Sequence, residues 1–202
     1  MRRLFSRVLV MMMALLLSGC GYNELQRLDE QVAASWSQVL NQYERRAELV
    51  PKLVASVDAY KVHERNVLEQ VTAARARVGQ VSLQAGDLDD PAMLQRFEQA
   101  QDALSGSLSR LLAVSERYPD LKSDGLFRDL MTQLEGTENR IAVARERYVT
   151  AVQAWNQAIR QFPELIMARV LGYQPKPQYG LDKADRVQQD PEVRFDQPAT
   201  PQ

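Results

Sequence analysis

The sequence predicts an all-α protein: an antiparallel up-and-down bundle of three long helices plus a short C-terminal helix, kinked near Pro51. Apolar residues recur three or four positions apart over most of residues 25–162, which is the spacing of amphipathic helices. Turn-forming segments separate these runs at 79–90 and at Pro119. No strand-like alternation appears before the last dozen residues. Long amphipathic helices joined by short connections pack most readily as antiparallel neighbours.

The composition narrows the classes of function. The chain has 202 residues, is 45% hydrophobic and 25% charged, and carries a formal net charge of −1. This is the make-up of one globular domain with tails. Without a basic excess to neutralise phosphates, we expect no nucleic-acid partner. A single cysteine excludes an internal disulfide framework and a cysteine-based zinc site.

The N-terminus has the parts of a secretory signal peptide. Arg2, Arg3 and Arg7 form a basic segment, and the apolar run 8–17 follows it. That run is shorter than the ~20 residues that a membrane-spanning helix needs. We therefore expect residues 1–19 to be a signal peptide. If the cysteine that follows is incidental, the alternatives are a plain signal peptide and an uncleaved anchor.

The lone cysteine follows this apolar run within a short motif. Leu17, Ser18, Gly19 and Cys20 match the bacterial lipobox at all four positions, and in lipoproteins of that type the cysteine thiol receives a diacylglycerol. We expect Cys20 to be the lipid attachment site and the first residue of the mature chain, anchored on the extracytoplasmic face of a membrane. If the cell has two membranes, Gly21 favours the outer membrane, facing the periplasm.

The first long helix is expected over roughly 23–78. Its apolar residues repeat a 3-4-4 spacing three times, an eleven-residue repeat typical of a nearly straight helix. Pro51 lies within this helix, where it removes a backbone hydrogen bond, so we expect a kink or a break there. The stripe consists of Leu25, Leu28, Val32, Trp36, Val39, Tyr43, Ala47, Val50 and Val54.

Two further long helices follow a loop at 79–90. Asp90 and Pro91 suit the cap and first turn of the second helix, and Pro119 ends it. The third helix has the most regular pattern of the chain: eleven positions in 3-4 alternation, ten of them apolar. Its seam is Phe127, Leu130, Leu134, Thr137, Ile141, Ala144, Tyr148, Ala151, Trp155, Ala158 and Phe162.

The C-terminal part of the chain changes character after Pro163. Residues 164–171 can add a short helix, and the bundle is expected to span 20–173. Residues 174–202 hold five of the nine prolines and few large apolar residues. This composition predicts an extended or disordered tail.

No catalytic or metal-binding pattern can be assembled from the sequence. His63 begins a motif like that of zinc proteases, but Val67 stands where the second histidine ligand would be. We therefore expect no enzyme, no cofactor and no metal. Gly106 and Gly136 lie within helices, and we interpret them as points of close helix–helix approach.

Charged residues gather in two bands, one in the first helix and one in the third. They form either a polar binding groove between helices or interhelical ion pairs that set the register of the bundle, and spacing alone favours the ion pairs. As a surface, they are the best candidates for binding a partner. The candidate residues are Arg45, Arg46, Glu138, Arg140 and Arg145.

Several segments resemble the LemA family of bacterial proteins, in the same order and over nearly all of residues 22–177. The most specific are RRAELVP at 45–51, YPDLK at 118–122 and EGTENRIAVAR at 135–145; PEVRF at 191–195 resembles an ending seen in such proteins. The resemblance implies an antiparallel helical bundle tethered to a membrane by its N-terminus, with no established enzyme activity. Many relatives carry an N-terminal transmembrane helix, whereas this chain has a lipobox.

These observations together predict a non-catalytic interaction protein of the cell envelope. Its expected partners are the membrane, through the N-terminal lipid, and an unidentified envelope protein or cell-wall component. The alternative is a structural spacer or a homo-oligomeric scaffold between membrane and cell wall, built on the long helices.

Overall fold

The computed structural model describes residues 2–60, 64–81 and 88–180, with side chains from residue 21 onward. Within these ranges there are six helices and no strand, which confirms the predicted all-α fold. The helices are α1 (Arg2–Ala59), α2 (Arg65–Gln80), α3 (Pro91–Ser115), α4 (Pro119–Ser123), α5 (Gly125–Ala158) and α6 (Glu164–Leu171).

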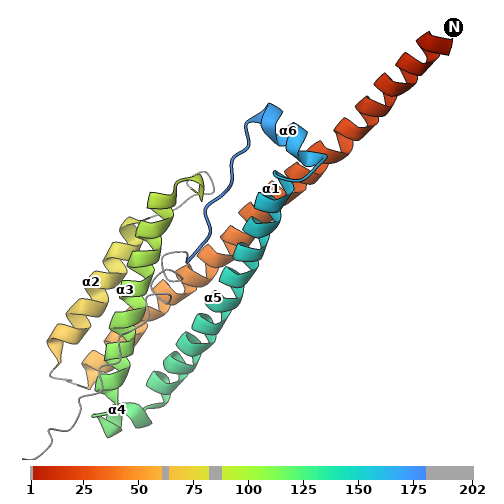
Figure 1. The fold of residues 1–202 in the computed structure, drawn as a ribbon. Coiled ribbons are helices and arrows are strands. Elements are labelled where there is room, and N and C mark those ends of the chain that lie inside the picture. Colours follow the sequence, from red (N-terminus) through yellow and green to blue (C-terminus); the bar gives the residue numbers. More distant parts are fainter. Residues whose placement is uncertain (1, 61–63, 82–87, 181–202) are drawn as a thin grey trace, which may run out of the picture.

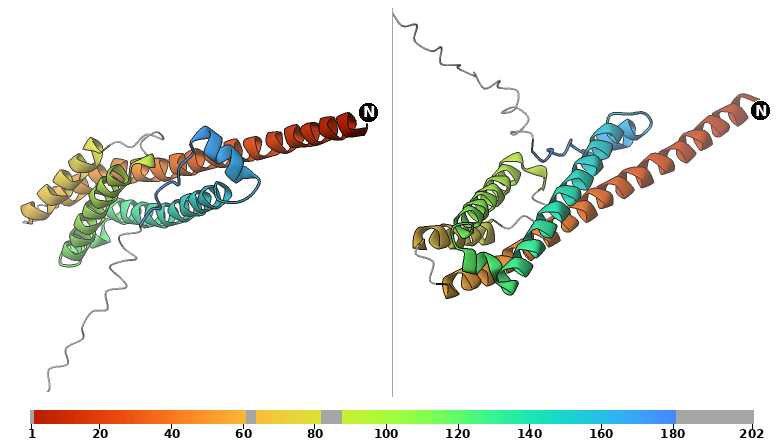
Figure 2. Two further views of the ribbon diagram at one scale, coloured as in Figure 1. Left: turned by 45° about the horizontal axis from the view of Figure 1, so that its top comes forward. Right: turned by 90° about the horizontal axis from the view of Figure 1, so that it is seen from below.

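The helices form two antiparallel pairs that lie against each other. α1 packs mainly on α5 and α2 packs mainly on α3, while the short α4 connects α3 to α5 at one end of the bundle (Figure 1). At the other end α6 turns back onto α1, and the N-terminal part of α1 continues beyond every other helix (Figure 2). None of the helices in the described residues is long and apolar enough to cross a membrane.

The first helix differs from its predicted extent. It runs through Pro51 and ends at Ala59, and the residues expected to continue it form α2, which folds back. Pro51 leaves the carbonyl of Ala47 without its helical donor. The Arg75 Nε of α2 donates to that oxygen at 3.1 Å, so the helix continues past the proline. Folding back after Ala59 buries one face of α2 against α3, at Leu68, Val71 and Ala74.

The predicted seam of α5 lies in the core. In α5 every seam residue from Phe127 to Trp155 is buried, including the polar Thr137. The prediction fails at the end of the series, because α5 stops at Ala158 and Phe162 is 74% exposed. In α3 the side chain of Asp90 accepts from the N–H of Ala92, as expected of its cap.

The buried stripe of α1 has a different phase from the predicted one. After Tyr43 the stripe continues in steps of three and four through Arg46, Val50, Leu53 and Val57, and the adjacent Leu49 and Ser56 are buried beside it. The predicted stripe placed Ala47 in the core and passed over Arg46, because a charged residue is rarely found fully buried. The eleven-residue repeat therefore holds only up to Tyr43.

The hydrophobic core consists of two clusters, one at each end of the bundle. One is rich in aromatic residues and lies toward α6, with Trp36, Phe97, Tyr148 and Trp155 among its members. The other is almost entirely aliphatic and lies toward α4. Along α1 the first cluster ends at Tyr43 and the second begins at Leu49, so Arg46 lies between them.

The first residues of the predicted tail pack against the bundle. Trp155 Nε1 donates to the carbonyl of Gln174 at 3.1 Å, and Asn156 exchanges two hydrogen bonds with the backbone of Lys176. Tyr179 is 8% exposed and belongs to the aromatic cluster. Residues 181–202, with the PEVRF motif, lie outside the described residues.

Gly106 and Gly136 do not mark close approach of two helices. A Cβ added at Gly106 would have no neighbour within 4 Å, and one at Gly136 would meet only the Arg140 side chain, 3.5 Å away. The close approach lies elsewhere: a Cβ at Gly21 would be 3.6 Å from the Glu164 Cα of α6.

Candidate functional site: a buried polar layer and the groove beside it

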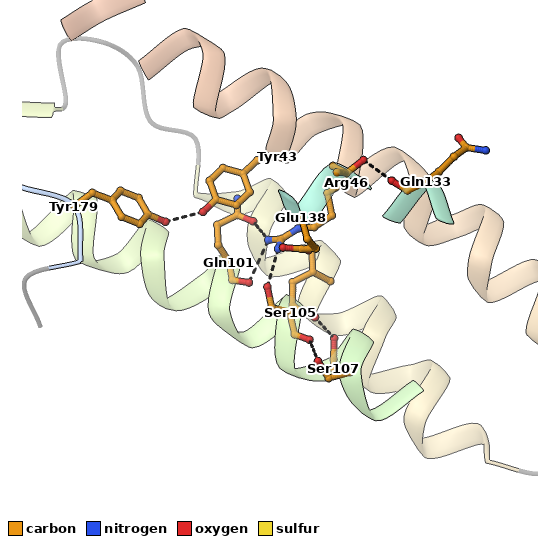
Figure 3. A network of polar contacts seen from close by, with 11 residues as sticks. Tyr43, Arg46, Gln101, Ser105, Ser107, Gln133, Glu138 and Tyr179 are labelled. Carbon is orange, nitrogen blue, oxygen red and sulfur yellow. Dashed lines mark hydrogen bonds and ion pairs between the residues drawn. The ribbon is translucent and has the colours of Figure 1, made fainter. Parts of the chain in front are cut away.

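A buried arginine crosses the middle of the bundle. Arg46 of α1 is 1% exposed, and its NH1 donates to Ser105 Oγ of α3 at 2.7 Å and to Glu138 Oε1 of α5 at 2.9 Å. Its NH2 donates to the carbonyl of Gln101 at 3.2 Å and to the side-chain oxygen of the same residue. Figure 3 shows the guanidinium reaching from α1 toward α3 and α5. We call Arg46, Gln101, Ser105 and Glu138 the polar layer.

The polar layer joins three helices and is mostly shielded from solvent. The Arg46 guanidinium lies 4.9 Å from the centre of the Tyr43 ring, and its Nε has no hydrogen-bond partner among the described residues. Glu138 is partly exposed and gives the layer one edge in water. A buried arginine of one helix whose partners come from two other helices fixes the relative register of all three. The ion-pair interpretation of the charged bands thus fits Arg46 and Glu138, and Arg46 is not on the surface.

An aromatic group adjoins the polar layer on the α6 side. The hydroxyls of Tyr43 and Tyr179 are 2.7 Å apart, and Trp36 lies against Phe97 and Tyr148 at ring-centre distances of 5.4 and 5.1 Å. Burial raises the pKa of Tyr43, Tyr148 and Tyr179 above the usual range of a phenol. The Tyr148 hydroxyl has no hydrogen-bond partner among the described residues.

The other predicted interaction residues lie in three different settings. The Arg145 guanidinium stacks over the Tyr179 ring, 4.2 Å from its centre, so it holds the chain after α6 against α5. Arg45 is exposed and makes no hydrogen bond or ion pair with a described residue. Arg140 is exposed, and its NH2 donates to Thr137 Oγ1 at 2.9 Å. The five candidates therefore do not form one surface.

A groove of about 530 Å³, most of whose lining residues carry amide or guanidinium groups, lies along the α1–α5 contact. Arg140 Nε donates to Gln42 Oε1 at 3.2 Å, and Arg147 NH1 donates to Gln38 Oε1 at 3.4 Å, so both arginines are held across the groove. No carboxylate is among its lining residues. We call this the α1–α5 groove; it is lined by Gln38, Asn41, Gln42, Asn139, Arg140, Val143, Ala144 and Arg147.

Sequence reasoning offered a polar groove between the first and third helices, with Arg140 in it, but missed the α1 residues that line it and the burial of Arg46. Amide side chains carry no charge signal, so Gln38, Asn41 and Gln42 gave no sign of a site. Arg46 could have been found from its register, because continuing the 3-4 alternation from Tyr43 places an arginine at a core position. His63 lies outside the described residues. In the part of the chain that the structure describes, no group of three or more histidine, cysteine, aspartate or glutamate residues could hold a metal ion.

Comparison with known proteins identifies the family. The model of the LemA family matches residues 35–195, which include both the polar layer and the α1–α5 groove. The chain belongs to the LemA family. It is also similar to Protein LemA of Metamycoplasma hominis, 25% identical over 140 residues, or 69% of this chain and 60% of that protein.

Other relatives of this LemA-family chain carry a different name. Magnetosome protein MamQ 2 of Paramagnetospirillum magneticum is 35% identical over 74 residues, and Magnetosome protein MamQ of Magnetospirillum gryphiswaldense is 32% identical over the same length. Each alignment covers 37% of this chain and 27% of the relative. The chain thus spans about a quarter of the length of the MamQ proteins it matches.

The segment predicted to be a lipobox lies near the start of the bundle in this LemA-family chain. Leu17, Ser18, Gly19 and Cys20 fall within α1, among residues whose side chains the structure does not describe. The buried stripe of α1 begins at Leu25, five residues after Cys20.

Proposed function

We propose that this LemA-family chain is a lipid-anchored interaction protein of the cell envelope that binds its partner through the α1–α5 groove and carries out no chemistry. Its place in the envelope rests on the lipobox at Leu17–Cys20 and on the signal-peptide pattern before it. In a cell with two membranes, the anchor would lie in the outer membrane, with the bundle in the periplasm.

The observation that carries the binding surface is a pair of arginines in a groove without carboxylates. Arg140 and Arg147 are exposed, and each is held in place by a glutamine of α1. An arginine already ordered by a neighbour loses less side-chain freedom when it binds a ligand. The exposed Val143 lies among the same lining residues and adds an apolar contact.

The chemistry of the groove favours a partner that carries carboxylates. Guanidinium groups bind carboxylates in paired geometry, and amide side chains both donate and accept hydrogen bonds to a peptide or sugar backbone. Acidic segments of envelope proteins and the acidic peptides of the cell wall both have this chemistry. The polar layer plays no direct part, because Arg46 is buried and already bonded.

Site-specific photo-crosslinking in living cells tests this proposal. A crosslinking amino acid at Val143, which is 46% exposed, should capture a specific partner. The same amino acid at Leu126, which is 62% exposed at the α4 end of α5, is the control and should not capture it. Adding Arg140→Glu and Arg147→Glu should abolish capture at Val143 without lowering the melting temperature. Equal capture at both positions, or capture that survives the charge reversal, would refute the groove as the binding surface.

A structural spacer is a second candidate, and the length of α1 favours it. A helix of 58 residues is about 87 Å long, and its N-terminal part extends beyond the other helices (Figure 1). This role depends on the signal segment being retained, because cleavage before Cys20 would remove that extension. The N-terminal residue of the protein isolated from membranes, determined by mass spectrometry, separates the two candidates. A lipid-modified Cys20 supports the anchored form, and an intact Met1 supports the spacer.

A further inference from the structure

Three large apolar side chains on and just before the short helix α6 point outward, whereas Met167 packs against the core. Phe162, Ile166 and Val170 are spaced by four residues, from just before α6 to its last turn, and are 74%, 54% and 74% exposed. The face toward the bundle carries the small Ala168, which is 2% exposed. A surface helix normally shows the opposite arrangement, with its large apolar residues facing the core. We call Phe162, Ile166 and Val170 the α6 stripe.

The α6 stripe lies where α1 leaves the bundle. Gly21 of α1 lies against Glu164, at the first residue of α6, and Gln26 donates to the Tyr173 hydroxyl at 2.7 Å just after α6 ends. Both ends of α6 are therefore held against residues within the first six after Cys20. Tyr22 adds a further exposed aromatic ring, 43% exposed, in this part of α1. Figure 2 shows α6 at the end of the bundle from which α1 projects.

The charges around the α6 stripe suit an anionic surface. Arg160 precedes the stripe and Arg169 lies in the last turn of α6; both are exposed, and neither makes an ion pair with a described residue. The one carboxylate of α6, Glu164, lies at the turn that contacts Gly21 and is half-buried. An apolar helical face flanked by arginines binds at the interface of membranes that contain anionic lipids.

We propose that the α6 stripe inserts into the surface of the bilayer beside the lipid on Cys20, so that the bundle stands on two contacts. This inference rests on the proposed lipid anchor. The two acyl chains of a diacylglycerol already hold the protein on the membrane, so the α6 contact fixes the orientation of the bundle there. The stripe is exposed on the protein because its partner is the lipid, and its position next to residues 20–22 leaves it facing the membrane.

Depth-dependent quenching of a new tryptophan tests this contact in the full chain. The native Trp36 and Trp155 are both 1% exposed and give a constant background. The protein, purified as the cell processes it, carries Phe162→Trp or the control Leu126→Trp and is reconstituted into vesicles of phosphatidylcholine and phosphatidylglycerol with brominated acyl chains. The added emission of Phe162→Trp should be mostly lost to the bromine atoms, and that of Leu126→Trp should persist. Adding Ile166→Asp to Phe162→Trp should restore most of the emission.

The outcomes distinguish a failure of the α6 contact from a failure of the lipid anchor. If the protein floats with the vesicles but Phe162→Trp is quenched no more than Leu126→Trp, the α6 contact is refuted and the anchor stands. If the protein does not float at all, both are refuted. If the Phe162→Trp emission shifts to shorter wavelength with protein concentration in the absence of lipid, a second copy of the chain covers the stripe and the membrane contact is again refuted.

Discussion

The Nε of Arg75 lies 3.1 Å from the carbonyl oxygen of Ala47 and donates a hydrogen bond to it. Ala47 is four residues before Pro51, so its carbonyl is the one that loses a helical N–H donor to the proline. A side chain of α2 thus replaces the missing backbone donor of α1. The same bond joins α1 to α2, which folds back along it. Both helices line a groove of about 810 Å³.

Replacing Arg75 by methionine should destabilise the protein by about 1 kcal/mol, because the Ala47 carbonyl loses its donor while the side-chain stem is kept. In a Pro51→Ala background the N–H of residue 51 bonds to that carbonyl, so Arg75→Met should cost much less. Urea denaturation of the four proteins of this double-mutant cycle gives the coupling energy. An equal cost of Arg75→Met in both backgrounds would mean that the bond does not compensate for the proline.

Truncating Arg46 should be the most damaging single change in the polar layer. Arg46→Ala leaves the Gln101 side chain, 2% exposed, without its partner and opens a cavity, so we expect a loss of about 3 kcal/mol. Arg46→Met fills most of the space and should cost less, as buried ion pairs replaced by apolar residues often do. Arg45→Ala is the matched control and should change stability by less than about 0.5 kcal/mol. Thermal melts of the three variants, monitored by circular dichroism, measure the differences in stability. Similar losses of stability for Arg45→Ala and Arg46→Ala would contradict the structural role of the polar layer.

Replacing glycine by alanine should change the stability of the protein in opposite directions at two positions. Gly106 lies within α3 with no neighbour within 4 Å of an added Cβ, so Gly106→Ala should stabilise the protein by about 1 kcal/mol. Gly172 ends α6 with φ of 73°, where only glycine is unstrained, so Gly172→Ala should destabilise by about 1 kcal/mol. Denaturant midpoints give the comparison. A destabilising Gly106→Ala would show that another surface packs there.

The buried tyrosines should make the protein unstable in alkali. Burial raises the pKa of Tyr148 and Tyr179 in the folded state, so the folded form keeps these phenols protonated when the unfolded chain ionises. The stabilising effect is therefore complete below about pH 10, the pKa of an unperturbed tyrosine, and is lost as the pH rises above it. Unfolding midpoints measured between pH 8 and 11.5 should fall steeply at the upper end, and a flat profile would contradict this assignment.

Two phenylalanine substitutions distinguish the roles of these hydroxyls. Tyr148→Phe removes a buried hydroxyl without a described partner, so at pH 7 it should be neutral or stabilising by up to about 1 kcal/mol. Tyr179→Phe removes the bond to Tyr43 and should cost about 1 kcal/mol. Both should reduce the loss of stability in alkali. If Tyr148→Phe is the more damaging change at pH 7, its hydroxyl is bonded after all.

Much of the fold could be predicted from the sequence, because most core positions on α3 and α5 are apolar and regularly spaced. Even Thr137 could be placed in the core, since its neighbours in the seam fixed the register. The extent of the first helix was harder to predict. Pro51 is the strongest local signal against a helix, but the donor that offsets it comes from Arg75, 24 positions along the chain. Helix propensity does not include such tertiary bonds.

The site was harder to predict than the fold. Charge density drew attention to Arg45 and Arg46 together, yet one faces water and the other lies between two hydrophobic clusters. One helical position separates these environments, and only the register of the full stripe distinguishes them. Gln38, Asn41 and Gln42 line a groove because α5 lies beside α1, a relationship between residues about 100 positions apart.

The core of the bundle begins at Leu25, and Gly21 already lies against α6, so no flexible linker separates the bundle from Cys20. A lipoprotein with a long disordered linker can search a wide volume above its membrane, because the reach of such a linker grows with its length. This chain has no such reach. An anchored copy would present the α1–α5 groove at a fixed height and tilt, and a ligand on the same membrane would meet it at a high effective concentration only if it stands equally tall.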